Sequence, residues 1–240
     1  MKRTVASSDL MKTLLPTVTL FGLDCINIDR LIQAAEICMK DFNFGKIKLL
    51  TSLRSDNINV VAIDPINSIE AYNHFMIKDI NSYINTDFVL VIQYDGFILN
   101  PSAWSDKFLS YDYIGSPWWE NKKYTVGNGG FSLRSKKLLK LLQKDDSIQI
   151  PDKDPEDWFI SVKIRDYLEK KGIVFAPIEL AKQFSFESNE KDGIDWTNQF
   201  GFHGLTWTNI SKWLRENQKY GIENPLDEWA LRVQKKFNPK

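Results

Sequence analysis

The sequence predicts an α/β fold in which one domain has a mainly parallel central sheet with helices on both faces. Its first ninety residues alternate short apolar segments with amphipathic ones at the spacing of βαβ units, whose strands run parallel through right-handed crossovers. Residues 88–96, FVLVIQYDG, form an apolar run that ends abruptly in Asp95. Such runs are typical of a strand buried on both faces. A chain of 240 residues is long enough to bury one core of this kind.

Strands and helices can be placed along this first half by their patterns. We expect strands at residues 17–23, 46–51, 59–63 and 88–96. The first helix has one apolar face at helical spacing, made by Ile28, Leu31, Ile32, Ala35 and Met39. A second apolar stripe, in the helix that leads into residue 88, is made by Tyr72, Met76, Ile80 and Tyr83.

The second half is less periodic. After a polar and aromatic loop at residues 116–126, which has the makeup of a lid, comes the glycine-rich segment 127–135, GNGGFSLRS. We expect helices over 136–142 and over 156–171, where Pro155 suits a helix start. A late strand is expected at 173–176. We divide the chain into an N-terminal segment (1–16), one domain (17–210) and a C-terminal helical extension (211–240).

Composition excludes several classes of partner. Basic and acidic residues balance at 31 each, so no overall field attracts nucleic acid. Cys25 and Cys38 have neither a zinc spacing nor the number of a disulfide scaffold, which favours a reducing, cytoplasmic location. No apolar run is long enough to span a bilayer and no signal peptide is recognisable.

The C-terminal extension carries an apolar stripe flanked by basic residues: Leu226, Trp229, Ala230, Val233 and Phe237. It fits either a helix on the inner surface of the membrane or one docked on the body or on a second subunit. Peripheral membrane contact and a homo-oligomer therefore both stay open.

Four groups of residues could carry chemistry. Gln93 and Asp95 end the buried strand, where parallel α/β sheets bind their ligands. The glycine cluster at 127–130 allows close approach of the backbone, and the pair Glu156–Asp157 and the lone His203 follow. Each has a structural explanation on its own: a turn aspartate, first-turn acids or a packed histidine. Together they supply ligands for a divalent metal and a second carboxylate pair for base catalysis.

The order of these groups within longer motifs resembles a known family. The motifs are QYDGF (93–97), YDYIGSPW (111–118), VGNGGFSLRS (126–135), PED (155–157), FAP (175–177) and FGFHG (200–204). They resemble a bacterial glycosyltransferase-like family of unknown function and, more distantly, inverting galactosyl- and N-acetylglucosaminyltransferases of the GT-A type. The resemblance runs from about residue 17 to residue 204. It implies a GT-A-like fold and a transferase that uses a nucleotide sugar.

The resemblance also implies roles at the donor site. Asp95 matches the last aspartate of a D-x-D motif, which binds Mn²⁺ or Mg²⁺ and through it the donor diphosphate. His203 matches a late histidine that completes the metal site. Gln93 stands where the first aspartate is usual, a departure that puts tight metal dependence in doubt. Gly22 and Asp24, at the end of the first strand, would lie beside the nucleoside.

At the acceptor side, the resemblance makes Asp157 the catalytic base of an inverting enzyme, with Glu156 beside it. Gly129 and Gly130 would form a glycine floor beside these groups and take part in binding the donor. The implied donor is a nucleotide sugar, and among these a UDP-sugar is expected first. The implied acceptor is a glycan or glycolipid in polysaccharide biosynthesis.

Two other functions stay open at this point. A nucleotidyltransferase that makes nucleotide sugars would need a glycine-rich, basic loop after the first strand, and residues 21–29, FGLDCINID, offer neither. A non-catalytic module that binds glycans or nucleotides on the same fold is the second alternative.

Overall fold

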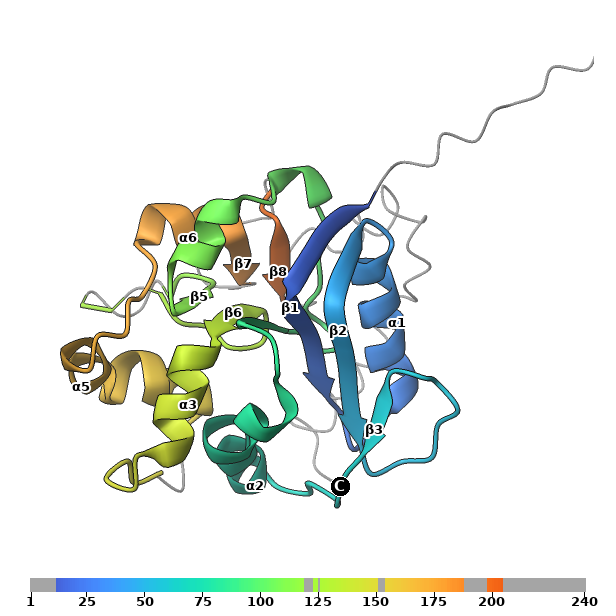
Figure 1. Ribbon diagram of the computed structural model, residues 1–240, viewed down its shortest axis with the longest axis horizontal. Coiled ribbons are helices and arrows are strands. Elements are labelled where there is room, and N and C mark those ends of the chain that lie inside the picture. The colour runs from blue at the N-terminus through green and yellow to red at the C-terminus, as the bar shows by residue number, and fades with distance from the viewer. Residues whose placement is uncertain (1–11, 119–122, 125, 151–153, 188–197, 205–240) are drawn as a thin grey trace, which may run out of the picture.

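A six-stranded sheet forms the centre of the protein in the computed structural model, which describes residues 12–118, 123–124, 126–150, 154–187 and 198–204 (Figure 1). The strand order is β3-β2-β1-β4-β6-β5. The strands are β1 (Thr13–Leu23), β2 (Phe42–Thr51), β3 (Val60–Ala62), β4 (Phe88–Val91), β5 (Tyr113–Gly115) and β6 (Ser132–Ser135). β1 pairs in parallel with β2 and β4, and β2 pairs in parallel with β3. β6 runs antiparallel to both β4 and β5, so the sheet is mainly parallel, as predicted.

Helices cover both faces of this sheet. They are α1 (Ile28–Met39), α2 (Ile69–His74), α3 (Lys136–Lys144), α4 (Glu156–Trp158), α5 (Arg165–Lys170) and α6 (Ile178–Phe184). Successive side chains of a strand point to opposite faces. On one face, the buried cluster that includes α1 contains Leu20, Leu49 and Leu90. The next residue of each strand, Phe21, Leu50 and Val91, belongs to the cluster with Phe75 and Met76 on the other face.

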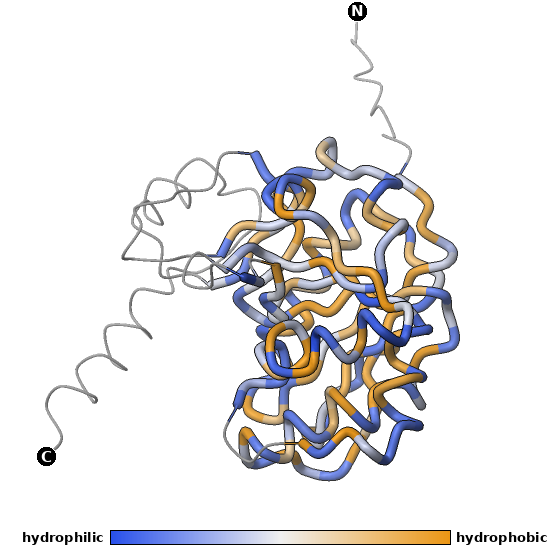
Figure 2. The backbone as a smooth tube through the Cα atoms, turned by 90° about the vertical axis from the view of Figure 1, so that its left-hand side faces the viewer, coloured by the Kyte–Doolittle hydropathy of each residue, from blue (hydrophilic) through white to orange (hydrophobic). Residues whose placement is uncertain are grey.

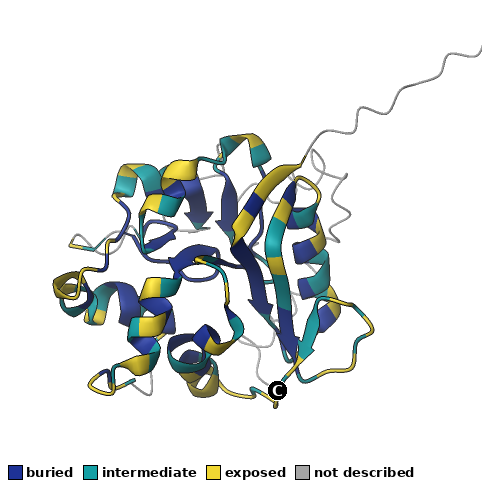
Figure 3. Ribbon diagram, in the orientation of Figure 1, coloured by how far each residue is buried: buried dark blue, intermediate teal, exposed yellow. Residues whose placement is uncertain are grey.

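Buried and exposed residues are clearly separated in this fold. The central strands are buried, and the helices turn exposed residues outward (Figure 3). Hydrophobic residues gather along the inner parts of the backbone and hydrophilic ones on its outer turns (Figure 2). The predicted single α/β domain with a mainly parallel sheet is confirmed. No helix within the described ranges is long and apolar enough to cross a bilayer.

Several elements differ from their predicted bounds. β1 begins at Thr13 rather than at residue 17, because residues 13–15 already pair with 42–44 of β2 before an irregularity in register. The predicted helix over 156–171 is interrupted by a π-helical turn, Phe159–Lys163. Within it, the Ile164 N–H bonds the Phe159 carbonyl, five residues back, at 3.0 Å. Hydrophobic spacing at a helical period does not reveal such an insertion.

The late strand expected at 173–176 is wrong. This segment forms only an isolated parallel bridge between Tyr113 and Phe175. It starts after Gly172, whose φ is 82°, and ends at Pro177, which begins α6. The Val174 N–H bonds the carboxylate of Asp112 at 2.9 Å instead of a strand carbonyl, so no ladder develops.

A small parallel sheet brings the end of the described chain to the main one. It consists of β7 (Ser185–Glu187) and β8 (Gly201–His203), with Glu187 opposite His203. Phe200 and Phe202 are fully buried, so the alternation along the strand leaves His203 at its end, facing out of the core. The N–H of Gly204 bonds the carbonyl of Asp95 at 2.8 Å, which fixes β8 beside the turn after β4. Residues 1–11 and the predicted extension 211–240 lie outside the described chain.

Candidate functional site

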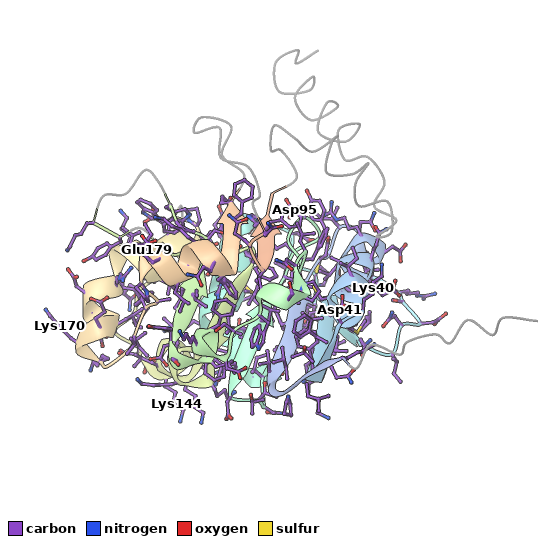
Figure 4. The ribbon with its side chains drawn as sticks, turned by 90° about the horizontal axis from the view of Figure 1, so that it is seen from above. Lys40, Asp41, Asp95, Lys144, Lys170 and Glu179 are labelled. Atoms are coloured by element: carbon purple, nitrogen blue, oxygen red, sulfur yellow. The ribbon has the colours of Figure 1, made fainter. Side chains whose placement is uncertain are left out.

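The turn after β4 presents Gln93 and Asp95 at the carboxyl end of the parallel strands. Ile92 still bonds the carbonyl of Phe21 on β1 at 2.8 Å. Gln93 then pairs with Gly96 in a tight reversal, closed by a 3.1 Å bond from the Gly96 N–H to the Gln93 carbonyl. Figure 4 shows Asp95 at the edge of the domain opposite to that of Lys144, the last residue of α3.

His203 meets this turn from β8. Its Nε2 lies 3.0 Å from Oε1 of Gln93 and 3.6 Å from Oδ1 of Asp95. Its Nδ1 lies 3.0 Å from Oε2 of Glu187, the neighbouring residue on β7. The structure thus brings together Asp95 and His203. It adds Glu187, which no motif or spacing in the sequence singled out.

Charge explains the protonation of His203 in this arrangement. Burial alone lowers the pKa of an imidazolium, because it penalises the charged form. The carboxylates of Glu187 and Asp95 outweigh burial and raise the pKa of His203 to about 10. These two carboxylates therefore favour the protonated ring, and a cation that binds Nε2 would have to displace this proton.

The same residues fit a divalent cation. Oδ1 of Asp95 is buried and has no hydrogen-bond partner among the described residues, its nearest charged neighbour being His203 at 3.6 Å. A buried carboxylate oxygen that accepts no hydrogen bond is unfavourable unless a bound cation compensates its negative charge. The contact between Nδ1 of His203 and Glu187 is the kind that orients a histidine ligand through its other nitrogen.

These side chains supply only part of a coordination shell. Among the described residues, no group of three or more His, Cys, Asp or Glu side chains is arranged to hold a metal. Asp95, His203 and the amide oxygen of Gln93 would leave positions for other oxygen ligands, which is how Mg²⁺ is commonly held together with phosphates.

Gly129 and Gly130 separate His203 from the acid pair and need to be glycines. A Cβ on Gly130 would lie 2.1 Å from Nε2 of His203. On Gly129 it would lie 2.6 Å from Oε1 of Glu156 and 2.7 Å from Cβ of Asp157. Only a residue without a side chain lets the backbone pass between these groups.

Asp157 lies on the other side of this glycine pair, at the start of α4. Its Oδ2 accepts a hydrogen bond from the Gly129 N–H at 2.8 Å, and its Oδ1 accepts one from the Trp158 N–H at 2.7 Å. Burial and the nearby charge of Glu156 raise the pKa of Asp157 to about 6, although both N–H groups oppose this rise. Asp157 is therefore a carboxylate that exchanges its proton close to neutral pH.

Glu156 has a different environment from its neighbour. It is buried, and its two carboxylate oxygens accept hydrogen bonds from Nη1 and Nη2 of Arg134 at 3.0 and 2.9 Å. Its N–H donates to Oδ1 of Asn73 on α2 at 3.1 Å. Both oxygens are thus occupied inside the protein. Arg134 lies within the GGFSLRS motif, but no pattern in the sequence pairs it with Glu156.

A pocket of about 410 Å³ lies between the end of β1, the start of α2 and the turn after β4. Residues that line it include Asp24, Arg30, Ser68, Tyr72, Gln93 and Tyr94. The guanidinium of Arg30 stacks 3.7 Å above the ring of Tyr94. Nε2 of Gln93 donates to the Tyr72 hydroxyl at 3.1 Å, so Gln93 connects this pocket to His203.

Of the two residues expected beside a nucleoside, only Asp24 lines the pocket. Its oxygens already accept hydrogen bonds from the N–H groups of Ile26 and Asn27 and from Nε of Arg30, the last at 2.7 Å. Asp24 therefore acts on the pocket through Arg30. Gly22 faces the core, because its Cβ would lie 2.6 Å from Leu31 on α1, and its absence of a side chain serves helix packing.

The loop predicted to be a lid is described only at its ends. An antiparallel bridge joins Pro117 to Val126, and the rings of Trp118 and Trp158 lie 5.1 Å apart. Residues 119–122 and 125 lie outside the described chain, so the lid stays a prediction.

Comparison with protein families decides where this chain belongs. Residues 57–203, more than half of the sequence, match the family described as "Protein of unknown function (DUF5672)". The chain is a member of the DUF5672 family. The matched region of this DUF5672 protein includes Asp95, Gly129, Asp157 and His203, whereas Asp24 and Arg30 precede it. No curated protein matches the sequence.

Solved structures to which this chain is similar include glycosyltransferases. The galactosyltransferase LgtC, in complex with donor and acceptor sugar analogs, is 16% identical, with a TM-score of 0.50 over 88% of this chain and 99% of that one. GlyE from Streptococcus pneumoniae TIGR4 is 14% identical, with a TM-score of 0.47 over 93% and 64% of the two chains. A glycosyltransferase involved in the glycosylation of the major capsid of PBCV-1 is 12% identical, with a TM-score of 0.48 over 82% of this chain and 97% of that one. The likeness to LgtC supports a GT-A-like fold for this DUF5672 member.

Proposed function

We propose that this protein is a glycosyltransferase that moves a sugar from a nucleotide sugar to a glycan or glycolipid, with inversion and with the help of a metal. The observation that carries the proposal is the arrangement around Gly129 and Gly130. On one side lie Asp95 and His203, which fit a cation. On the other lies Asp157, a carboxylate whose pKa is raised to about 6.

The pocket beside Gln93 has the size and the place of a donor site. Its volume of about 410 Å³ falls within the range of small-molecule sites, and it opens beyond the carboxyl end of β1. Arg30 and Tyr94 offer a cation and an aromatic ring to a nucleoside diphosphate. A UDP-sugar is our first choice of donor.

Asp95 and His203, with the amide oxygen of Gln93, would hold Mn²⁺ or Mg²⁺. When bound, such an ion supplies positive charge for the leaving diphosphate. Glu187 holds the imidazole of His203 by Nδ1, which leaves Nε2 facing Asp95 and the donor side of the site.

Asp157 would act as the base for the acceptor. Its carboxylate takes the proton of the attacking hydroxyl while that oxygen bonds to the anomeric carbon and the bond to the diphosphate breaks with its electron pair. The N–H groups of Gly129 and Trp158 fix the two oxygens of this carboxylate. A base with a pKa near the working pH is effective in such proton transfers.

The segment after β1 gives no support to a nucleotidyltransferase. Instead of a glycine-rich basic loop it contains the Asp24 turn, whose carboxylate bonds the N–H groups of residues 26 and 27 ahead of α1. The cytoplasmic location and the contact of residues 211–240 with a membrane or a second subunit stay parts of the proposal.

Thermal unfolding in the presence of nucleotides tests the donor and metal roles together. With Mn²⁺, UDP at about 100 times its Kd should stabilise the protein by about 2.7 kcal/mol. For a chain of this size, that corresponds to an increase in Tm of roughly 5–10 °C. EDTA should remove the increase, and so should Asp95→Asn, which takes one charged ligand away.

Asp56→Asn is a matched control, since Asp56 is an exposed aspartate that does not line the pocket beside Gln93. It should keep the Mn²⁺-dependent shift. Equal nucleotide affinity in EDTA and in Mn²⁺ would show that the proposed metal role is wrong. The first explanation to examine would then be Gln93, which stands where the first aspartate of the motif is usual.

A further inference from the structure

Arg134 is the most deeply buried charge in the described chain, and the proposed chemistry does not use it. Its side chain has 0% exposure at the centre of β6. Removing a guanidinium from water is unfavourable unless its donors are satisfied by well-placed acceptors. Here each nitrogen finds one: Nη1 and Nη2 bond Glu156, Nε bonds the Ser132 hydroxyl at 3.0 Å, and Nη2 also reaches the Gly129 carbonyl at 3.4 Å.

The acceptors of Arg134 lie on both sides of Asp157. Glu156 directly precedes it in the chain, so the paired guanidinium and carboxylate fix the first residue of α4. Gly129 gives its carbonyl to Arg134 and its N–H to Oδ2 of Asp157. One side chain therefore holds the start of the helix that carries Asp157 and also the glycine whose N–H binds its carboxylate.

Space around Gly129 makes this arrangement tight. A Cβ on that residue would lie 2.9 Å from Nη2 of Arg134, 2.6 Å from Glu156 and 2.7 Å from Asp157. Arg134, Glu156, Gly129 and Asp157 thus pack as a closed unit, which we call the arginine clamp. Movement of one member displaces the others, because close-packed interiors leave no room for independent shifts.

We propose that Arg134 is a positioning residue that aims the carboxylate of Asp157, through Glu156 and through the backbone of Gly129. This inference rests on the proposed role of Asp157 as the base. The planar fork of arginine is needed, because two parallel N–H groups bind the two oxygens of Glu156. A lysine offers the charge without that fork.

Charged and titratable groups from several elements face Asp157, and any pH readout reports all of them. Glu156 is on its own helix, Arg134 on β6, His203 on β8, Tyr72 on α2 and Tyr113 on β5. Burial and Glu156 raise the pKa of Asp157, and Arg134 lowers it. Replacing both members of the ion pair by neutral groups removes the two opposing charges at once and leaves position as the main variable.

The test uses the full chain and three variants. Arg134→Met/Glu156→Gln replaces the ion pair by neutral side chains of similar size, which avoids an unpaired buried charge. Arg134→Lys keeps the charge and removes the fork. Arg165→Met is the matched control: Arg165 is also largely buried, pairs with Glu169 and stacks on Phe175, and makes no contact with Asp157.

The first readout is the amide resonance of Gly129 in NMR spectra of the ¹⁵N-labelled protein. In the wild type and in Arg165→Met it should shift with pH, with a midpoint at about 6, because it donates to Asp157. In the other two variants this transition should be lost or displaced. The second readout is sugar transfer, which should fall on the order of 10²-fold in both, the size of effect expected when a catalytic group is misplaced by about 1 Å. Nucleotide binding should not change.

An Arg134→Met/Glu156→Gln protein that keeps the Gly129 transition, and transfers within twofold of Arg165→Met, overturns the proposal and leaves Arg134 a purely structural role. Should the double variant fail to fold, Arg134→Lys decides by the same two criteria. If the wild type transfers no sugar from any nucleotide sugar but the Gly129 transition is lost in the variants, the proposed function fails and the arginine clamp stands.

Discussion

Asp157→Asn is expected to lower sugar transfer by about 10²- to 10⁴-fold, the usual effect of removing a general base. Nucleotide affinity should stay at the wild-type value, because Asp157 lies across the glycine pair from Asp95 and His203. Asparagine keeps the shape and one acceptor oxygen, so one of the two hydrogen bonds from the N–H groups of Gly129 and Trp158 is kept and the other is lost. Asp154→Asn, in the same segment but paired with Lys163 at the surface, is the control and should transfer normally.

The pH dependence of the wild type gives the same test without a mutation. Asp157 must be ionised to accept a proton, and its pKa is raised to about 6. The transfer rate should therefore be constant well above pH 6 and fall as the pH drops below it.

If Asp157→Asn transfers at nearly the wild-type rate while Glu156→Gln does not, the two acids have exchanged roles. If neither change matters, the mechanism is wrong.

Gly130→Ala should abolish most of the metal-dependent nucleotide affinity. The new Cβ would lie 2.1 Å from Nε2 of His203 and must push the imidazole away from Asp95. Displacing the groups that orient a metal ligand typically lowers metal affinity by about 10- to 100-fold. Calorimetric titration of UDP into the Mn²⁺-loaded variant measures this loss.

Gly172→Ala is the control that separates the local effect of Gly130→Ala on His203 from a general loss of stability. Gly172 has a φ of 82°, so an alanine there is expected to destabilise the fold by about 1–2 kcal/mol, yet its Cβ would meet only Nζ of Lys137, at 3.8 Å. It should bind UDP as the wild type does. Wild-type affinity in Gly130→Ala would show that His203 takes no part in binding the donor.

The parts of the site that the sequence predicted are those that depend on strand direction. The apolar run that forms β4 and the alternation before it imply a parallel pair with β1, and that pairing puts the turn with Asp95 at the ligand-binding edge. The end of β1 explains the different outcomes at Gly22 and Asp24. Gly22 points toward Leu31 and into the core, whereas Asp24 comes after the end of β1 and reaches the pocket.

Contacts between distant segments could not be predicted from one sequence. Arg134 and Glu156 pair because β6 lies between β4 and β5 in the sheet while α4 is held by Asn73, an arrangement that no local spacing records. Glu187 reaches His203 only because β7 and β8 pair in one particular register. The π-helical turn after Trp158 could not be predicted either, because one inserted residue barely alters the pattern of apolar positions in the sequence.

Release of nucleoside diphosphate from nucleotide sugars tests the central claim most directly. The full chain, with Mn²⁺ and with EDTA, is incubated with a set of nucleotide sugars that starts with UDP-sugars, and the free diphosphate is quantified beside Asp157→Asn. The account predicts turnover of at least one nucleotide sugar that requires Mn²⁺ and is lost in Asp157→Asn. Binding of nucleotide sugars without release of diphosphate from any of them, with or without a glycan acceptor, would contradict it and identify the protein as a non-catalytic binding module.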